Sequence, residues 1–358
     1  MIKPKRLKKG DKIAIVSLSR GLLGMPFIKH ELDLGIKRLK ELGLEPVIMD
    51  NSLKDMDTLF DHPELRAQDL KQAFLDDSIK GIITAIGGDD TYKTIPYLME
   101  DKEFMEAVKK HPKIFTGFSD TTNNHWMFHK LGLETFYGPC FLVDLAELGN
   151  NMLPYTKKSF EKFFQNEKSY SIESSPVWYL EREDFGPEQV GIPRKRKQEK
   201  HGYEVLNGKG RVTGKLFGGC LDSIYDIYTS ERYGEENKIY KKYKILPTLE
   251  EWSEKILFME TSEEKMSPEK LEKVLRFFKK EKILETVKGI IVGKPMDETY
   301  YEEYKGVYKK VFKDLDTPVL FNVNFGHSTP RALIPYGVEA TVDYTKKTIT
   351  INEPIFDK

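Results

Sequence analysis

The sequence predicts an α/β protein of two domains, with a mostly parallel sheet in the first half of the chain. In that half, short apolar β-type runs alternate with segments of helical period, which is typical of βα units. The chain has 358 residues, more than one hydrophobic core usually supports. The regular pattern breaks between about residues 170 and 210. We therefore expect an α/β domain at 1–165, an insertion or linker loop at 166–212 and a second domain at 213–358.

The first half supplies its elements in a clear order. Residues 12–18 form the first expected strand, and residues 28–42 the first helix, because apolar side chains recur there with roughly helical period. This helix stops at Gly43, as a glycine after a helix C-terminus predicts. The later elements, in chain order, are a strand at 45–49, a helix at 63–75, a strand at 81–86, a helix at 91–99, a strand at 113–118, a helix that includes 126–131 and a strand at 135–137.

The second half begins with a segment that has no clear period. Pro176, Pro187 and Pro193 interrupt it, and residues 194–200 are strongly charged. Loops of this length are usually functional lids or disordered linkers, and the sequence leaves both alternatives open. Regularity returns from Gly214, and no internal repeat is found. The expected elements there are an apolar run at 256–259, a helix at 268–280, strands at 289–292 and 319–323, and a terminal hairpin at 338–351.

The composition favours a small partner. Fifty-seven basic and fifty-seven acidic residues cancel, so neither nucleic acid nor a membrane surface is expected as the main partner. The apolar stretch at 13–18 is too short for a signal peptide, and no run approaches the roughly 20 apolar residues of a membrane span. The two cysteines, Cys140 and Cys220, do not indicate a disulfide framework. A cytoplasmic location is the simplest expectation.

Four apolar strands end in residues that could carry chemistry. These ends are the glycine loop at 86–91 and the segments that contain Ser119, Glu260 and His327. Because ligands gather at the carboxyl ends of strands in open α/β sheets, the four ends are expected to line one crevice.

Ser119 lies where a strand passes through Gly117 into a helix. In the nucleophile elbow of other hydrolases a serine occupies such a turn, in a G-x-S-x-G pattern. Here Thr121 replaces the last glycine, so the sequence pattern is incomplete and only the position of the serine, between a strand and a helix, matches. Ser119 is therefore a candidate nucleophile, and a helix N-cap is the alternative.

The other residue types fit the chemistry that an acyl-transfer serine needs. A histidine such as His327 can take the hydroxyl proton at neutral pH. A carboxylate such as Glu260 can hold the histidine in the right tautomer and stabilise its charged form. The backbone amides of Gly88 and Asp120 are the expected donors to the oxyanion.

Each of these residues also has a plainer interpretation. Glu260 could be a surface carboxylate, and His327 could cap a turn. His125 and His129 lie four residues apart on one helix, but no third ligand has a recognisable spacing, so no metal site is expected. A protein that binds without catalysis on the same scaffold is a further alternative.

The glycine loop has an alternative from another functional class. Its sequence, G-G-D-D-T from Gly87, resembles the GGDGT phosphate-binding loop of NAD and lipid kinases, in which glycine amides hold phosphate. A nucleotide-binding kinase therefore remains an alternative to a hydrolase.

Several motifs taken together resemble one known family. They are G-F-S-D, I-G-G-D-D, L-F-M-E and G-H-S-T-P-R-A-L-I-P-Y-G, preceded by K-K-G-D-K-I-A-I-V-S-L-S. In this order they look like the LD-carboxypeptidase and microcin C self-immunity family of serine peptidases, over about residues 9–342. The resemblance implies a Ser119, His327 and Glu260 triad without a cofactor. It also implies a flavodoxin-like N-terminal domain, a smaller β-rich C-terminal domain and a homodimer.

The resemblance also implies the class of substrate. The glycine loop I-G-G-D-D is similar to that of the immunity branch, which cleaves the amide between an aspartyl group and a modified adenylate. The alternative branch, the LD-carboxypeptidases, removes terminal D-alanine from cytoplasmic murein tetrapeptides. The expected partner is therefore an aminoacyl-nucleotide or a small peptide.

The resemblance suggests four substrate-binding residues, which are Gly87, Asp89, Tyr203 and Trp178. Two positions depart from the pattern of the immunity branch. Cys220 stands where asparagine is usual, and Tyr203 stands where tryptophan is common.

Overall fold

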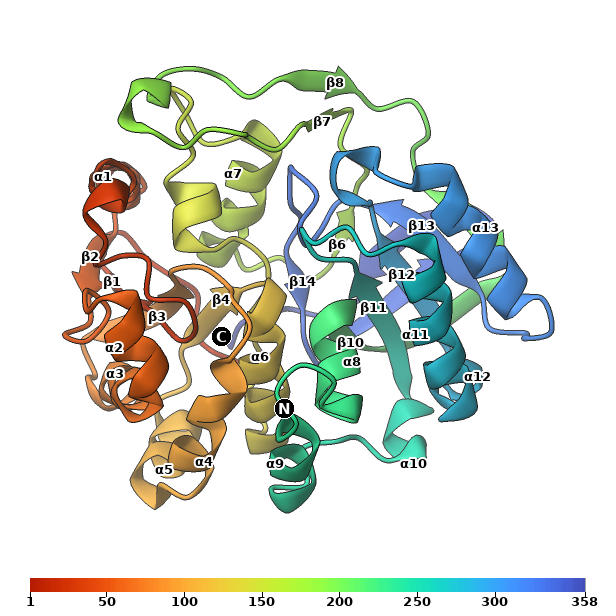
Figure 1. The fold of residues 1–358 in the computed structure, drawn as a ribbon, viewed down its shortest axis with the longest axis horizontal. Helices are drawn as coiled ribbons and strands as arrows, with labels where there is room; N and C mark the ends of the chain where they lie inside the picture. The colour runs from red at the N-terminus through yellow and green to blue at the C-terminus, as the bar shows by residue number, and fades with distance from the viewer. Residues whose placement is uncertain (358) are drawn as a thin grey trace.

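The computed structural model describes residues 1–357 and contains two large sheets with helices around them. Figure 1 shows the first half of the chain on one side of the molecule and the second half on the other. In residues 1–357 no helix is long and apolar enough to cross a membrane.

The first sheet has the strand order β14-β5-β4-β3-β1-β2. Strands β5, β4, β3, β1 and β2 pair in parallel, and this order is that of a flavodoxin-like sheet. The bounds of its first five strands are β1 (Lys12–Val16), β2 (Glu45–Ile48), β3 (Ile79–Thr84), β4 (Ile114–Gly117) and β5 (Phe136–Tyr137). The predicted fold class is therefore confirmed for the first half of the chain.

Helices cover both faces of this sheet. From β1 the chain moves to one edge of the sheet to form β2, and it then moves the other way across the sheet to form β3, β4 and β5. Because such connections are right-handed, this reversal places α1 on one face of the sheet and α3 and α5 on the other. In agreement, α3 packs against α5, whereas α1 packs against η4. The helical segments here are η1 (Pro26–Ile28), α1 (Lys29–Glu41), α2 (Met56–Asp61), α3 (Pro63–Leu75), η2 (Thr91–Thr94), α4 (Ile95–Met99), α5 (Lys102–Lys110), η3 (Ser119–Thr121), α6 (Thr122–Leu131), η4 (Phe141–Leu145), α7 (Pro154–Glu161) and η5 (Lys162–Phe164).

The second sheet has eight strands in the order β6-β16-β15-β10-β11-β12-β13-β9. Its centre, β10 to β13, is parallel, and antiparallel strands extend both sides. The strands are β6 (Tyr170–Ile172), β9 (Glu204–Asn207), β10 (Arg211–Cys220), β11 (Lys255–Glu260), β12 (Gly289–Gly293), β13 (Val319–Val323), β15 (Glu339–Asp343) and β16 (Thr348–Ile351). The expected terminal hairpin is confirmed as β15 and β16. In contrast, β14 (Ile334–Pro335) leaves this half and pairs with β5 in the first sheet.

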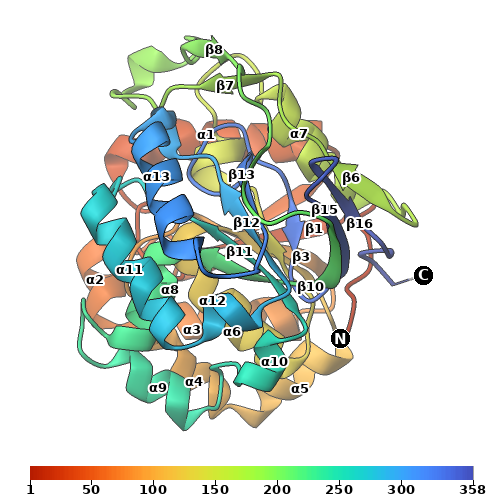
Figure 2. The ribbon, with the colours of Figure 1, turned by 90° about the vertical axis from the view of Figure 1, so that its right-hand side faces the viewer.

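Helices also surround the second sheet, so this half is itself an α/β arrangement with a β-rich rim. They are α8 (Leu221–Thr229), α9 (Glu236–Lys242), α10 (Leu249–Trp252), α11 (Pro268–Lys280), α12 (Ile283–Thr286), η7 (Met296–Glu298) and α13 (Tyr301–Phe312). In the view of Figure 2, α11 and α13 lie side by side, and they also pack against each other.

The two halves meet along α6, the helix that follows Ser119. Trp126 on this helix is fully buried and donates from Nε1 to the Gly218 carbonyl of β10 at 2.8 Å. Its ring also packs against Phe217 and Trp252. Burying large aromatic surfaces is strongly stabilising, so α6 holds the Ser119 turn firmly against the second sheet.

The segment expected as a loop, 166–212, contains short strands. Its outer strands β6 and β9 join the second sheet, and β7 (Val177–Tyr179) and β8 (Arg196–Gln198) form a separate pair. Residues of β8 are all exposed, so no alternation of apolar and polar residues marks this strand in the sequence. Figure 1 shows β7 and β8 crossing the top of the molecule above both halves.

Candidate active site

Ser119 occupies a strained turn at the carboxyl end of β4. Its φ is +64°, a left-handed conformation that costs a residue with a side chain on the order of 1–3 kcal/mol. The turn begins η3, which leads directly into α6. Strain of this kind is found at functional turns, and here the Ser119 hydroxyl contacts His327 of the second half of the chain.

The structure brings Ser119, His327 and Glu260 together. Ser119 Oγ lies 3.0 Å from His327 Nε2, and His327 Nδ1 lies 2.8 Å from Glu260 Oε2. Glu260 is the last residue of β11, and His327 follows β13 by four residues. When Nδ1–H donates to Glu260, Nε2 can accept the proton of the serine hydroxyl. This geometry suits general-base activation of a serine nucleophile.

A buried tyrosine, Tyr137, completes a ring of hydrogen bonds around these residues. Its hydroxyl donates to Glu260 Oε1 at 2.5 Å and accepts from the Ser119 amide at 3.0 Å. The side chain of Tyr137 is fully buried, and burial together with the nearby charge of Glu260 raises its pKa far above the usual range. The sequence analysis missed this residue because a tyrosine in an apolar strand looks like any other core aromatic.

His327 lies between two carboxylates. Glu263 Oε2 is 2.8 Å from Nε2, the same nitrogen that contacts Ser119 Oγ. Burial disfavours the imidazolium, but the charges of Glu260 and Glu263 outweigh burial and raise the pKa of His327 to about 10. Glu260 makes the larger contribution to this raised pKa, and Glu263 adds to it through the same nitrogen that contacts Ser119.

The glycine loop after β3 lies directly over Ser119. A methyl group at Gly87 would come within 2.6 Å of Ser119 Cβ and 2.8 Å of its Oγ, so no larger residue fits there without moving the serine. The amide of Gly88 has no hydrogen-bond partner within residues 1–357. Gly88 lines the same cavities as Ser119, so its amide is a candidate oxyanion donor.

Internal contacts hold this loop in place. Ser19 Oγ accepts hydrogen bonds from the amides of Asp89 and Asp90 and donates to Asp120 Oδ2 at 2.9 Å. Asp90 forms a buried ion pair with Arg66 at 2.7 Å. The amides of Asp89 and Asp90 are therefore occupied by the protein itself, which argues against phosphate binding by the GGDDT loop.

The loop that carries His327 is fastened to the first half of the chain. Arg331 Nη1 pairs with Asp144 Oδ1 at 2.6 Å, and its Nε donates to the Gly326 carbonyl at 2.5 Å. The guanidinium also lies 4.4 Å from the centre of the Phe118 ring. These contacts fix the position of His327 relative to the Ser119 turn.

Two cavities meet at Ser119. The larger, of about 950 Å³, is bordered by His327 and by apolar residues that include Phe27, Phe118 and Phe185. Phe185 belongs to the 166–212 segment, so this segment covers part of the larger cavity. The smaller, of about 60 Å³, is polar and lies between the glycine loop, α8, the start of α9 and the loop after β11.

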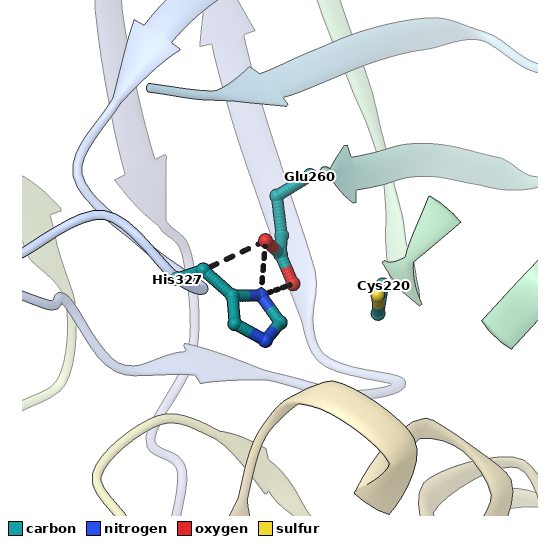
Figure 3. A group of neighbouring side chains, drawn as sticks. All are labelled: Cys220, Glu260 and His327. Carbon is teal, nitrogen blue, oxygen red and sulfur yellow. Dashed lines mark hydrogen bonds and ion pairs between the residues drawn. The ribbon is translucent and has the colours of Figure 1, made fainter. Parts of the chain in front are cut away.

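Cys220, Glu260 and His327 place one potential metal ligand each within 4.8 Å of one another, and Figure 3 shows this group. However, Glu260 and His327 hydrogen-bond directly, which leaves no room for an ion between them. Burial and the Glu260 charge also raise the pKa of the Cys220 thiol far above its usual range. The arrangement is therefore suited to a hydrogen-bonded pair and not to a metal ion.

The four residues suggested for substrate binding lie in different places. Gly87 borders the larger cavity and Asp89 the smaller one. Trp178 and Tyr203 border neither: both are nearly buried, the Trp178 ring lies under the Lys294 ammonium, and the Tyr203 hydroxyl donates to the Ile172 carbonyl. Their aromatic rings are used to pack the 166–212 segment. Phe185 is the aromatic residue of this segment that reaches the cavity.

The two histidines of α6, His125 and His129, are largely buried within the protein. His125 is fully buried between the Gly117 carbonyl at 3.0 Å and Thr135 Oγ1 at 2.8 Å. Burial lowers the pKa of His125 and of His129 to about 3. His125 therefore stays neutral and supports the strand that leads to Ser119.

Comparisons with known proteins were made on sequence and structure. The LD-carboxypeptidase N-terminal domain family matches residues 13–138, and the LD-carboxypeptidase C-terminal domain family matches residues 213–342. The microcin C7 self-immunity protein MccF of Escherichia coli is 28% identical, over 80% of this chain and 78% of its own. A probable murein peptide carboxypeptidase of Bacillus subtilis is 27% identical, over 98% of this chain and 94% of its own.

Solved structures are also similar. An MccF-like protein from Streptococcus pneumoniae in complex with AMP is 46% identical, with a TM-score of 0.91, covering 96% of this chain and 99% of that one. MccF in complex with aspartyl sulfamoyl adenosine is 25% identical, with a TM-score of 0.83, covering all of both chains.

Proposed function

This chain belongs to the LD-carboxypeptidase family of peptidase hydrolases, and from that premise we propose the reaction that it catalyses. It hydrolyses the amide bond between a small aminoacyl group and a bulky, nucleotide-like leaving group. Ser119 is the nucleophile, His327 the base and then the acid, and Glu260 the carboxylate that supports the histidine.

The distances around Ser119 support each step of this reaction. The Ser119 hydroxyl gives its proton to His327 Nε2, 3.0 Å away, as its oxygen attacks the carbonyl carbon. The amides of Gly88 and Asp120 stabilise the oxyanion. His327 then returns the proton to the nitrogen of the leaving group, and water hydrolyses the acyl-enzyme by the same route in reverse.

The size of the cavity beside His327 is the observation that favours a bulky leaving group. Because His327 protonates the leaving group, that group must lie on the His327 side of Ser119. The cavity there measures about 950 Å³, and its surface is mostly apolar, with charged side chains such as Lys29 and Glu31 also lining it. A departing D-alanine would fill little of this volume, whereas a nucleoside has both the size and a flat face for stacking on an aromatic ring.

The comparisons support the same choice. The similar protein from Streptococcus pneumoniae was solved with AMP, and MccF was solved with aspartyl sulfamoyl adenosine. The second candidate is an LD-carboxypeptidase that acts on murein peptides, which the relative from Bacillus subtilis favours. We further propose a homodimer that acts in the cytoplasm. Light scattering on the purified protein tests the homodimer.

A side-by-side assay tests the proposed reaction. The purified protein is given aspartyl sulfamoyl adenosine or a murein tetrapeptide, and products are followed by liquid chromatography. We expect the adenosine compound to have the higher kcat/KM, and no turnover of either by Ser119→Ala. A higher kcat/KM for the tetrapeptide would favour the second candidate, and turnover of neither substrate by the wild-type protein would contradict both.

A further inference from the structure

The smaller cavity at Ser119 is strongly acidic. Seven carboxylates line it, against two guanidinium groups, Arg20 and Arg232. Such an excess needs either partners within the protein or a cation from outside, because unpaired carboxylates out of water are costly.

Most of the seven carboxylates have partners within the protein. Arg232 lies 3.5 Å from Asp89, 3.5 Å from Asp226 and 2.9 Å from Glu264. Glu263 contacts His327, and Asp120 accepts three hydrogen bonds, from Ser19, Thr91 and Asn123. Within residues 1–357, Asp222 and Glu236 each keep one buried carboxylate oxygen without a hydrogen-bond partner, whereas the other oxygen of Asp222, Oδ2, accepts from the Ser262 amide at 3.0 Å.

These two are buried and incompletely paired. Asp222 is 8% exposed and Glu236 is 2% exposed. Within residues 1–357, Asp222 Oδ1 and Glu236 Oε2 have no hydrogen-bond partner, although both residues line the cavity. The nearest cation to Asp222 is the Lys270 ammonium, at 4.0 Å from Oδ1 and beyond hydrogen-bond distance. Buried acceptors without donors point to a donor that the substrate brings.

The position of His327 decides which part of the substrate enters this cavity. His327 borders the larger cavity and not the smaller one, whereas Ser119 borders both. Since the leaving group lies on the His327 side, the acyl group must lie on the other side, in the smaller cavity.

We propose that the acidic cavity binds a protonated amino group on the acyl part of the substrate, through Asp222 and Glu236. The inference rests on the proposed function, because it assigns the acyl side from the role of His327. The ammonium can be the α-amino group of the acyl residue or the side-chain amine of a basic one. An aspartyl group carries this α-ammonium too, so the aspartyl compound of the assay above meets the requirement.

An ammonium suits this cavity better than a divalent metal ion. Three or more ligand atoms must converge on a metal, and within residues 1–357 Cys220, Glu260 and His327 are the group found with that spacing. The carboxylates of the acidic cavity do not converge in this way. An ammonium needs only two or three acceptors, each at hydrogen-bond distance.

The pKa values of the neighbouring carboxyl groups fit a cavity that binds a cation. Burial and then the neighbouring charge of Asp226 raise the pKa of Glu236 to about 8. Burial likewise raises the pKa of Asp226 to about 6, against the opposing effect of Arg232. A bound ammonium lowers these pKa values again, so its binding at neutral pH releases a proton.

Two pairs of aminoacyl sulfamoyl adenosines test the inference and distinguish the two sources of the ammonium. Alanyl and N-acetylalanyl compounds differ in the α-ammonium, and N-acetyl-lysyl and N-acetyl-norleucyl compounds differ in the side-chain ammonium. We expect removal of the ammonium to lower kcat/KM about 100-fold in at least one pair, because a buried charge then loses its partner. A difference below threefold in both pairs would overturn the inference.

Variants of the cavity test whether Asp222 and Glu236 cause the preference for compounds with an ammonium. Asp222→Asn and Glu236→Gln should each reduce the preference for the compound with the ammonium at least tenfold. Glu235→Gln, at the exposed neighbour of Glu236, is the matched control and should keep the full preference. Thermal unfolding checks that the variants fold. A preference that survives both cavity variants would contradict the assignment.

Failure of the proposed function gives a different result. If the wild-type protein hydrolyses none of the four compounds, the proposed reaction is wrong. Calorimetry of their binding to Ser119→Ala then still tests whether the acidic cavity binds an ammonium. Affinity at least tenfold higher with the ammonium, together with proton release, supports the inference. Equal or undetectable affinity overturns it.

Discussion

The two cavities that meet at Ser119 differ in size, polarity and construction. The larger one is mostly apolar and bordered by the 166–212 segment, whereas the smaller one is acidic and formed by helices and loops of the two halves. A serine between such unlike spaces can act on an asymmetric substrate, with a bulky flat group on one side and a small charged group on the other. The predictions below test this difference, beginning with the residue that both sides depend on.

Gly87→Ala should damage the reaction for every substrate. The added methyl group would lie 2.6 Å from Ser119 Cβ and must displace the nucleophile. Because a displacement of about 1 Å can cost 100-fold, we expect kcat to fall about 100-fold or more. Steady-state kinetics on substrates with different acyl and leaving groups measure the effect.

Gly306→Ala is the matched control for that change. Gly306 lies within α13, and a methyl group there would meet nothing within 4 Å. Activity should be unchanged, and unfolding should cost about 0.5–1 kcal/mol more because alanine is the better helix former. Normal activity in Gly87→Ala would show that the loop over Ser119 is more pliable than the structure indicates.

Phe185→Ala should affect the larger cavity alone. Its ring lines the space proposed for the leaving group, and a base stacked on an aromatic ring is worth about 1–3 kcal/mol. We therefore expect kcat/KM for a nucleoside-containing substrate to fall about 10- to 100-fold, while substrates with a small leaving group change little. Phe60→Ala, at an exposed phenylalanine that lines neither cavity, should change neither. An equal loss on both kinds of substrate would remove the distinction between the cavities.

Tyr137→Phe should lower kcat without any preference between substrates. The hydroxyl links the Ser119 amide to Glu260 from behind the site and borders neither cavity. Its loss leaves the buried amide unpaired, so we expect about a tenfold decrease in kcat with an unchanged KM. Tyr344→Phe removes another buried hydroxyl, bonded to the Ile290 carbonyl, and should leave kcat intact. A change in KM alone would contradict a positioning role.

Glu263→Gln should change the pH dependence more than the maximal rate. Glu263 and Glu260 together raise the pKa of His327 to about 10, and the reaction needs neutral His327. Removing Glu263 lowers this pKa, so the acidic limb of the kcat/KM profile should move to lower pH. A profile that stays in place would show that Glu263 does not contact His327 in solution.

The same pKa sets a dependence of stability on pH. Because folding raises the pKa of His327 from its unfolded value of about 6.5, its contribution to stability is fully present below about pH 6.5. That contribution is lost as the pH rises toward 10. Denaturant unfolding at several pH values should show this loss, and Glu263→Gln should make the loss smaller.

Most of the parallel framework could be predicted from the sequence. The helix predicted at 63–75 is α3, and the helix predicted at 268–280 is α11. Buried parallel strands are continuous apolar runs, so the residues that end them, such as Ser119 and Glu260, stand out in the sequence. That is why the strand ends could be chosen as candidates before their arrangement was known.

The remaining features depend on contacts between distant parts of the chain. Strand β14 has two residues, and only its pairing with β5 makes it a strand. Tyr137 and Arg331 acquire their importance from partners more than 100 residues away, Glu260 and Asp144. For the same reason the sequence favoured Trp178 and Tyr203 for the substrate, whereas the chain folds so that Phe185 borders the cavity.

The central claim is that Ser119, between these two cavities, attacks the substrate. The most direct test measures the turnover of aspartyl sulfamoyl adenosine by the wild-type protein and by Ser119→Ala under identical conditions. We expect kcat of the variant to fall about 10,000-fold or more, while calorimetry shows that it still binds the compound. Turnover of the variant within tenfold of the wild-type rate would contradict the claim.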